Sequence, residues 1–458
     1  MSHIKVNLIL LPYEETVRNP PISLCYIGAL LKQKNYEVKL IDLNFDKEIP
    51  NSDFNVVAST TEDYYNCPLL NLKDIKLNLL KIKAIGKPLI LIGPHGTSTP
   101  EYFQNYADYI VVGEPEITVS ELIHAIVNKK NLRKIKGISF KLGEKIIKTK
   151  PQPFITNLDS LPFPNRSLLK SNKYTNPMCK YYPFTVIFTT RGCPYQCTFC
   201  YKGVYGNIWR KRNPDKVVEE IIEIRRKYKV RELWIRDDLF LLDKERIIKI
   251  CDGMIKNNLN MSWHCQSRID NIDENIIKKI KQAGCHTISL GIESGSSEII
   301  KRIKKGINLK DTEKVVKLCK KYGIKTRGYF IIGFPGETKE TIKQSFELAK
   351  KLDLDFFAIS ILTPYPNTEI FNRALEKKII PKKENLWEAS LRYAGQIETK
   401  FTFEQLVDLK RELYKRYYLR LGYILPRLNP SKIDMVYRGF IPFLKQLFVK
   451  KFRGQSLE

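Results

Sequence analysis

The chain has 458 residues, 43% of them hydrophobic, and a formal net charge of +29 at pH 7. This length and apolar content predict a globular protein with two or three domains. No stretch reaches the roughly 18 apolar residues that a membrane span requires. The amino-terminal residues show no cleavage site of a signal peptide. Ten cysteines without an export signal therefore predict a cytoplasmic protein whose thiols stay free to bind metal.

The excess of Lys and Arg lies almost entirely after residue 145. Basic surfaces attract nucleic acid, anionic lipid or anionic small molecules. A generally lysine-rich composition is the alternative explanation, and the charge pattern by itself does not choose between the two.

Short apolar strands alternate with helices over residues 1–145. Apolar residues at helical spacing predict helices at 22–34, 69–83 and 119–129. Strands are predicted at 4–11, 38–42, 54–60, 88–93 and 109–113. This alternation predicts an α/β fold, a Rossmann-like doubly wound sheet with helices on both faces. Ligands of such sheets bind at the carboxyl ends of the strands.

Residues 146–183 are rich in Lys, Pro and Asn and are predicted to be a linker, in which Cys179 is a bystander. From residue 184 a strand-helix unit repeats up to residue 380. Six parallel strands are predicted, at 184–189, 231–240, 261–268, 286–296, 326–338 and 356–369. Residues 381–458 are predicted to form a helical carboxyl-terminal region.

Cys193, Cys197 and Cys200 stand in the stretch T-T-R-G-C-P-Y-Q-C-T-F-C-Y-K-G, residues 189–203. Three thiolates satisfy three irons of a [4Fe–4S] cluster. Without a fourth cysteine at comparable spacing, one iron stays open to a ligand that is not protein. A zinc knuckle would need a fourth ligand close by, and the nearest downstream histidine is His264. Three unrelated core cysteines are the remaining alternative.

The C-x-x-x-C-x-x-C loop, the strand before it and Phe199 before the last cysteine resemble the radical S-adenosylmethionine (SAM) superfamily. The resemblance implies a partial (β/α)₆ barrel at residues 184–380, in which the amino and carboxylate groups of SAM chelate the open iron. It also implies that one electron cleaves SAM to a 5′-deoxyadenosyl radical. An external electron donor of flavodoxin or ferredoxin type is therefore an expected partner.

The same resemblance gives the strand ends of this barrel a role in binding SAM. An acidic pair suits the ammonium group, an arginine suits a carboxylate or an anionic substrate, and a carboxylate with a hydroxyl suits the ribose. Missing side chains in a G-x-P-G-E-T loop let the backbone approach adenine. In that order, the residues are Asp237 and Asp238; Arg268; Glu293 and Ser294; and Gly333, Gly336 and Glu337, with Phe199 also at the adenine. By contrast, Lys304 and Lys305 are expected to be solvated helix-end charges.

The loops that end the fourth and fifth strands resemble the cobalamin-binding domain fused ahead of many radical SAM enzymes. The family pattern is followed except that Ile92 and Pro115 replace glycines. The resemblance implies that cobalamin lies across this sheet edge, near Gly93, His95, Thr97, Gly113, Glu114 and Thr118. No D-x-H-x-x-G motif follows the first strand, so cobalt is expected to lack a histidine lower ligand. The alternative is a Rossmann-like domain that has lost its cofactor.

These resemblances predict a cobalamin-dependent radical SAM enzyme that C-methylates an unactivated carbon of a small-molecule or lipid substrate. Ring closure or oxidation, as in anaerobic porphyrin cyclases, is the alternative reaction. A non-catalytic cobalamin or nucleic-acid binder is the alternative of another class. Methylthiolation of transfer RNA is disfavoured, because residues 1–145 hold only Cys25 and Cys67, and nucleic acid is not an expected partner.

Two aromatic, basic segments lie in the carboxyl-terminal region. Residues 401–420 resemble the helix that closes the open side of the barrel in cobalamin radical SAM enzymes. Residues 437–452 mix Phe, Leu and Lys in the manner of an interfacial membrane helix. Contact with the inner face of the membrane is thus one expectation for this segment, and packing on the protein's own surface is the other.

Overall fold

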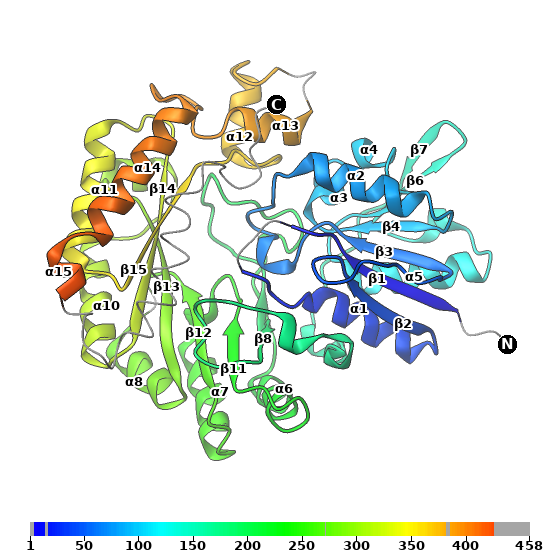
Figure 1. The fold of residues 1–458 in the computed structure, drawn as a ribbon, viewed down its shortest axis with the longest axis horizontal. Coiled ribbons are helices and arrows are strands. Elements are labelled where there is room, and N and C mark those ends of the chain that lie inside the picture. Colours follow the sequence, from blue (N-terminus) through cyan, green and yellow to red (C-terminus); the bar gives the residue numbers. More distant parts are fainter. Residues whose placement is uncertain (1–3, 14–16, 271, 382–384, 426–458) are drawn as a thin grey trace.

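The computed structural model describes residues 4–13, 17–270, 272–381 and 385–425 (Figure 1). Two sheets lie side by side in Figure 1, the amino-terminal one in blue and cyan and the second in green and yellow. The carboxyl-terminal helices, in orange, lie against the second sheet.

The amino-terminal sheet has seven strands in the order β2-β1-β3-β4-β5-β6-β7. Pairing is parallel from β2 to β5 and antiparallel for β6 and β7. The strands are β1 Lys5–Leu10, β2 Glu37–Asp42, β3 Phe54–Ala58, β4 Leu89–Ile92, β5 Tyr109–Val111, β6 Ile138–Leu142 and β7 Lys145–Lys148. The helices are α1 Ile22–Gln33, α2 Leu72–Lys83, α3 Pro94–Ser98, α4 Pro100–Phe103 and α5 Pro115–Val127.

Both faces of this sheet are covered by helices. Leu8 and Leu10 of β1 pack with α1 and α5 in one buried cluster, whereas Ile9 packs with α2 in another. Successive side chains of a strand point to opposite faces, so one strand serves both cores. The doubly wound fold predicted for this region is confirmed. The β6–β7 hairpin was not expected, and the predicted boundary at residue 145 falls within it.

The second sheet is wholly parallel, in the order β15-β14-β13-β12-β11-β8. Its strands are β8 Phe184–Ile187, β11 Glu232–Ile235, β12 Ser262–Ser267, β13 Cys285–Glu293, β14 Lys325–Ile332 and β15 Phe356–Ile361. The helices between and after them are α6 Pro214–Arg226, α7 Lys244–Lys256, α8 Glu274–Gln282, α9 Ser297–Arg302, α10 Leu309–Lys321, α11 Lys339–Leu352, α12 Glu369–Glu376 and α13 Leu386–Arg392. All six predicted strands are present, and β8 and β15 are not paired with each other, which makes the barrel partial.

The edge strand β15 is covered by α14 (Phe403–Tyr418), which α15 (Leu421–Ile424) follows. Tyr418 Oη accepts a hydrogen bond from the backbone N–H of Phe357 and donates one to its carbonyl, both at 2.8 Å. Tyr414 Oη accepts from the N–H of Ile359 at 2.9 Å. An exposed edge strand invites pairing with other chains, and these hydroxyls satisfy its free backbone groups. The helix predicted within residues 401–420 is present, and it covers the edge strand β15.

Within the described residues, no helix is both long and apolar enough to cross a bilayer. The segment 437–452, considered above as an interfacial helix, lies outside those residues.

Candidate active site

The three motif cysteines lie on a loop at the carboxyl ends of the parallel strands. After β8 the chain forms a two-stranded antiparallel ribbon, β9 (Thr190–Arg191) with β10 (Arg210–Lys211), and the cysteine loop connects the two. Gly192 opens this loop with φ +79°, and a Cβ atom there would meet the carbonyl oxygen of Ile208 at 2.2 Å. Only glycine fits that approach, so the sequence R-G-C fixes where the cysteine loop begins.

The cysteine thiols are suited to a cluster rather than to a single ion. Cys193, Cys197 and Cys200 are all partly exposed. Their sulfurs do not all lie within 4.8 Å of one another, whereas another group in the described chain does meet that spacing. Burial raises the pKa of Cys193 to about 11 and that of Cys200 well above its usual value. Thiols of this kind ionise when a bound metal stabilises the thiolate, so the donor set fits an iron-sulfur cluster.

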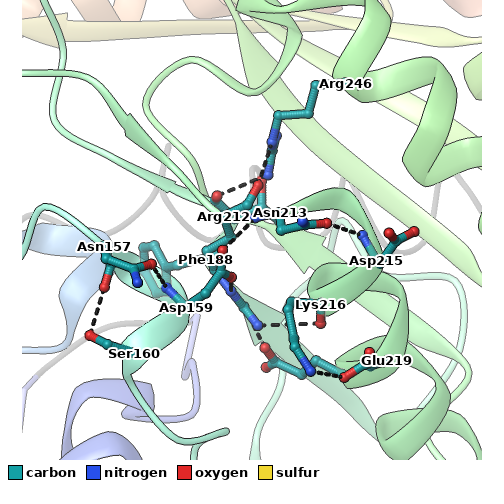
Figure 2. A network of polar contacts seen from close by, with 12 residues as sticks. Asn157, Asp159, Ser160, Phe188, Arg212, Asn213, Asp215, Lys216, Glu219 and Arg246 are labelled. Atoms are coloured by element: carbon teal, nitrogen blue, oxygen red, sulfur yellow. Dashed lines mark hydrogen bonds and ion pairs between the residues drawn. The ribbon is translucent and has the colours of Figure 1, made fainter.

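Buried arginines fix the backbone that leads into this loop (Figure 2). Arg212 donates to the carbonyl of Phe188 at 3.1 Å, and Arg246 donates to the carbonyl of Thr189 at 2.9 Å. Arg246 also donates to the carbonyl of Arg212 at 3.0 Å. Asp159, from the segment between the two sheets, accepts from the N–H of Asn213 at 2.8 Å. The end of β8 is thus held by fixed charge-assisted bonds.

The two adjacent aspartates that follow β11 have different surroundings. Asp237 is fully buried and accepts from the backbone N–H of Thr189 at 2.6 Å and from its hydroxyl. Asp238 accepts from the side-chain amide of Asn66, which belongs to the amino-terminal sheet region. Burial raises the pKa of Asp238, and the Asp238 carboxylate in turn raises the pKa of the Cys193 and Cys200 thiols. Asp238 therefore lies within electrostatic reach of Cys193 and Cys200, while Asp237 supports their loop.

A buried ion pair lies near Cys197 of the cysteine loop. Lys305 Nζ lies 2.7 Å from Glu293 Oε1, and the two side chains are only 8% and 9% exposed. Burial opposes the ammonium charge, but the Glu293 carboxylate outweighs it and the pKa of Lys305 is raised. The expectation that Lys305 is solvated is wrong, because the turn after α9 folds it back onto the end of β13. Lys304, by contrast, pairs with Glu369 on the surface.

Arg268 lies beside this pair. It donates to the carbonyl of Lys305 at 2.6 Å and to Asp270 at 3.0 Å, and its guanidinium lies 3.6 Å from the centroid of the Tyr195 ring within the cysteine loop. Cys197 helps to raise the pKa of both Arg268 and Lys305, which places both cations within electrostatic reach of this sulfur. Arg268 and Lys305 thus lie near Cys197, whereas Asp238 lies near the other two cysteines of the motif.

Glu293 has φ +67°, a left-handed conformation at a strand end, next to a register shift between β13 and β14. A non-glycine residue in this region is strained and recurs at functional sites. Ser294, which follows, lies 3.1 Å from Ser345 Oγ. The carboxylate of Glu293 is therefore turned toward Lys305, and the Ser294 hydroxyl is turned toward α11.

The loop after β14 is shaped by Glu337. Its carboxylate accepts from the backbone N–H groups of Gly333 and Phe334, the latter at 3.2 Å, and burial raises its pKa to about 7. Phe199 packs on Phe334 with ring centroids 5.3 Å apart. The space left by the missing side chain of Gly333 is taken by the backbone of Gly395. Gly333 therefore serves the packing of the carboxyl-terminal segment as well as the loop.

Gly336 has a similar function in packing. It has φ +77°, and a Cβ atom there would lie 1.9 Å from Arg302 Nη1. The glycines of this loop thus let α9 and the carboxyl-terminal segment approach the end of β14.

In the amino-terminal sheet, the predicted loops meet at one edge. Gly93 has φ +103° and begins α3, where His95 is fully buried. The two ring nitrogens of His95 lie 2.8 Å from Ser59 Oγ and from the Leu69 carbonyl. Thr97 accepts from the N–H of Gly113 at 3.1 Å, joining the two loops. Both ring nitrogens of His95 thus have protein partners.

Glu114 is also committed to protein partners. Arg191 and Arg210 donate to its carboxylate at 3.1 and 2.8 Å, and the N–H of Ile155 donates at 2.7 Å. Arg191 also reaches Glu116 at 2.5 Å. Because Arg191 and Arg210 belong to the ribbon that carries the cysteine loop, these pairs fasten that loop to the edge of the other sheet.

Several buried hydroxyls at this edge have no hydrogen-bond partner among the described residues. Thr60 and Thr61 follow β3, and Thr118 and Ser120 lie on α5. Unpartnered buried polar groups are rare in proteins and call for an explanation. A bound polar ligand would supply the missing partners, so this edge fits the tail of a cofactor. A small cavity between this edge and the cysteine loop is lined by Asn66, Thr190 and Asp238, among others.

Sequence reasoning missed Asn66, Lys305 and the Glu114 pairs. Asn66 and the Glu114 pairs depend on residues that are distant in the chain, Asn66 and Asp238 being 172 residues apart, whereas Lys305 and Glu293 are 12 residues apart. The one local signal was the K-K-G sequence at 304–306, where Gly306 with φ +66° allows the chain to turn.

Comparisons with known proteins agree with this geometry. Residues 187–349 match the family model of the Radical SAM superfamily. An uncharacterised methyltransferase of Pyrococcus horikoshii is 33% identical over 443 residues, which are 92% of this chain and 94% of that protein. The chain belongs to the radical SAM superfamily.

This radical SAM protein is also similar to a second relative and to a solved structure. An anaerobic magnesium-protoporphyrin IX monomethyl ester cyclase of Synechocystis sp. is 26% identical over 391 residues, 81% of this chain and 76% of that one. The solved structure of the radical SAM methyltransferase TsrM from Kitasatospora setae, with cobalamin and a [4Fe–4S] cluster bound, has a TM-score of 0.67 at 18% identity. It covers 81% of this chain and 75% of its own. The shared fold thus includes both sheets.

Proposed function

We propose that this radical SAM enzyme is a cobalamin-dependent methyltransferase that places a methyl group on an unactivated carbon. The observation that carries the proposal is the arrangement of the two sheet edges: the cysteine loop lies between them and is fastened to the amino-terminal sheet by Arg191 and Arg210. A [4Fe–4S] cluster and SAM supply a radical, and a cobalamin supplies the methyl group, when they are bound.

Cys193, Cys197 and Cys200 would hold the cluster, and the charges around them would orient SAM. Asp238 lies within electrostatic reach of Cys193 and Cys200 and suits the ammonium of the amino acid part of SAM. Arg268 and Lys305 lie near Cys197, and their positive charges suit the carboxylate of SAM. With Asp237 engaged by Thr189, its role is to position the loop rather than to touch SAM.

The remaining strand ends would bind the nucleoside of SAM. Glu293 is placed to accept from ribose hydroxyls while Lys305 balances its charge. Phe199 and Phe334 form an aromatic wall that suits adenine, and Glu337 holds the backbone beside it. These residues bind and orient, and the enclosed site excludes water that would quench a radical.

The amino-terminal edge would hold cobalamin. Gly93, Thr97 and Gly113 shape the two loops, and the unpartnered hydroxyls of Thr118 and its neighbours offer hydrogen bonds to the nucleotide tail. His95 and Glu114 would shape this edge through their protein partners without touching the ligand. The methyltransferase of Pyrococcus horikoshii and the cobalamin-bound methyltransferase TsrM support this assignment.

The test is anaerobic reconstitution of the full chain with iron, sulfide and methylcobalamin, followed by addition of SAM and a strong reductant, since radical SAM enzymes need an electron source. We expect 5′-deoxyadenosine to form, and to depend on Cys197. With SAM carrying a deuterated methyl group, substrates in cell extract should gain one labelled methyl in each turnover after the first, which uses the methyl group of the added methylcobalamin. A reconstituted cluster that cleaves no SAM would refute the proposal.

A second candidate reaction is oxidative ring closure, which the similarity to the Synechocystis cyclase favours. Both reactions form 5′-deoxyadenosine, but only methylation transfers the label. Mass analysis of extracts from cells with and without the protein separates them: methylation adds one methyl to the product, whereas cyclisation removes hydrogen.

A further inference from the structure

We infer that the protein holds a structural zinc ion at the opposite end of the barrel from the cysteine loop, with Cys179, Glu232 and His264 as its ligands. This site uses none of the groups assigned to the cluster, SAM or cobalamin. One ligand atom from each of the three side chains can be chosen so that all lie within 4.8 Å of one another.

The topology brings these residues to the amino ends of the strands. Glu232 is the first residue of β11, and His264 is the third residue of the neighbouring strand β12. Cys179 precedes β8 by five residues and belongs to the segment that joins the two sheets. The cysteine loop lies past the carboxyl end of β8, so the two metal centres are at opposite ends of one parallel sheet.

The three side chains are buried, with Cys179 and His264 each 2% exposed and Glu232 0%. Neither ring nitrogen of His264 has a hydrogen-bond partner among the described residues, and the same holds for Glu232 Oε2. Leaving such groups buried and unpartnered costs about 1–3 kcal/mol each. A metal ion in their midst would bind one ring nitrogen of His264 and Glu232 Oε2, and so would give two of these groups a partner.

The spacing and chemistry suit zinc. Zinc binds Cys sulfur, His nitrogen and carboxylate oxygen in a tetrahedron, and bonds of about 2.0–2.3 Å place the ligand atoms roughly 3.3–3.8 Å apart. His264 Nδ1 lies 3.7 Å from Glu232 Oε1, too long for a hydrogen bond, so this ring nitrogen is left for a metal ion. The thiolate and carboxylate would carry two negative charges, which balance Zn²⁺ in a buried place.

A second residue orients the carboxylate. His286 Nε2 lies 2.8 Å from Glu232 Oε1, and its Nδ1 lies 2.8 Å from Thr287 Oγ1. This leaves Glu232 Oε2 for the metal. Hydrogen-bonded partners of this kind commonly fix the ligands of metal sites. Trp234 also stacks on His264, with ring centroids 5.5 Å apart and an interplanar angle of 21°.

Zinc binding would anchor the segment between the two sheets, which contains Cys179. Zinc would tie Cys179 to β11 and β12, and so fix the start of β8, whose far end leads to Thr189 and the cysteine loop. With three protein ligands, the fourth position of the tetrahedron would be taken by water. The ion would add rigidity to the scaffold, and it lies at the opposite end of the sheet from the cysteine loop.

The test uses the full chain with the cluster cysteines removed, C193A/C197A/C200A, so that zinc cannot occupy the motif loop. Elemental analysis of this variant and of the iron-loaded wild type should give one zinc per chain in each. In the variant background, Cys179→Ala or His264→Ala should lower bound zinc at least tenfold. Cys67, which is exposed, and His124, which is partly exposed, provide matched controls, and Cys67→Ser and His124→Ala should retain the metal.

A spectroscopic measurement covers the case in which a substitution impairs folding. Exchange of zinc for Co²⁺ in the cluster-free chain should give the strong visible bands of four-coordinate cobalt and a thiolate-to-cobalt charge-transfer band. Cys179→Ser should remove the charge-transfer band and keep the visible bands. Absence of zinc from the cluster-free chain, or a Co²⁺ spectrum without thiolate that is the same with and without Cys179, would overturn the inference.

Discussion

The buried ion pair of Glu293 and Lys305 allows stability and SAM binding to be separated by experiment. At 2.7 Å, the attraction between the two charges is about 6 kcal/mol at an effective dielectric constant of 20. Desolvation costs several kcal/mol for each ion, so the pair as a whole contributes little. Removing one partner leaves the other charge buried and alone, which costs about 3–5 kcal/mol.

We therefore expect Lys305→Met to lower the free energy of unfolding by about 3–5 kcal/mol. The double variant E293Q/K305M removes both charges and should recover most of that loss. Lys304→Met is the matched control, because Lys304 pairs with Glu369 at 2.8 Å but both side chains are 51% exposed. Exposed pairs contribute about 0–1 kcal/mol. Anaerobic urea unfolding of the full chain measures all three.

Binding of SAM should not recover in the double variant E293Q/K305M, although its stability does. Charged hydrogen bonds contribute about 1.5–3 kcal/mol, so the double variant should bind SAM at least about tenfold more weakly, measured by calorimetry on the reconstituted enzyme. The reasoning is refuted if Lys305→Met costs no more stability than Lys304→Met. A double variant that binds and cleaves SAM like the wild type would show that the pair is only structural.

Three further outcomes are expected. Cys197→Ala should prevent reconstitution of the cluster, seen as loss of iron and of the visible cluster absorption, and should abolish 5′-deoxyadenosine formation; a variant that keeps the cluster would contradict the site. Glu114→Gln should lower the free energy of unfolding by about 3–5 kcal/mol because Arg191 and Arg210 lose a buried partner, whereas Glu121→Gln at an exposed position should change little in the same urea titration. The pKa of Glu337 is raised to about 7 from 4.5, so between these pH values the folded state holds a proton that the unfolded state has released. The free energy of unfolding should therefore fall as pH rises from 4.5 to 7. Glu337→Gln should flatten this pH dependence, and an equal slope in the variant would exclude Glu337 as its source.

Much of the fold could be predicted because its signals are local. The strand at 88–93 is a continuous apolar run and the strand at 4–11 is mostly apolar, since a parallel sheet covered on both faces buries both sides of each strand. The β6–β7 hairpin was missed because its outer strand, Lys145–Lys148, is charged and largely exposed. Helix α5 begins at Pro115 rather than 119, because proline is favoured in the first turn of a helix.

The site was predicted in part for the same reason. Asp238 and Arg268 follow strands, and parallel strands bring their carboxyl ends to one edge. The sequence could not show that Asp237 turns back to Thr189. Asp237 and Asp238 are adjacent and chemically identical, and only the conformation of the chain after β11 decides which of them points to Thr189. Nor could it show that Lys305 is buried, since its partner Glu293 is reached through the turn at Gly306.

By itself, the sequence determined the cysteine loop and the alternation of strands and helices. Both depend on the spacing of residues that are close in the chain. Covalent geometry limits the conformations that such a short stretch can adopt, so its pattern predicts local structure without knowledge of distant partners. Only the tertiary structure decided which charges remain buried together: Glu114 with Arg191 and Arg210, and Glu232 with His286 beside Cys179 and His264. The physical reason is that a charge is stable away from water only beside its complement. These partners lie tens of residues apart. The Glu114 pairs form only when the two sheets pack, and the Glu232 group forms only when the strands of the second sheet align.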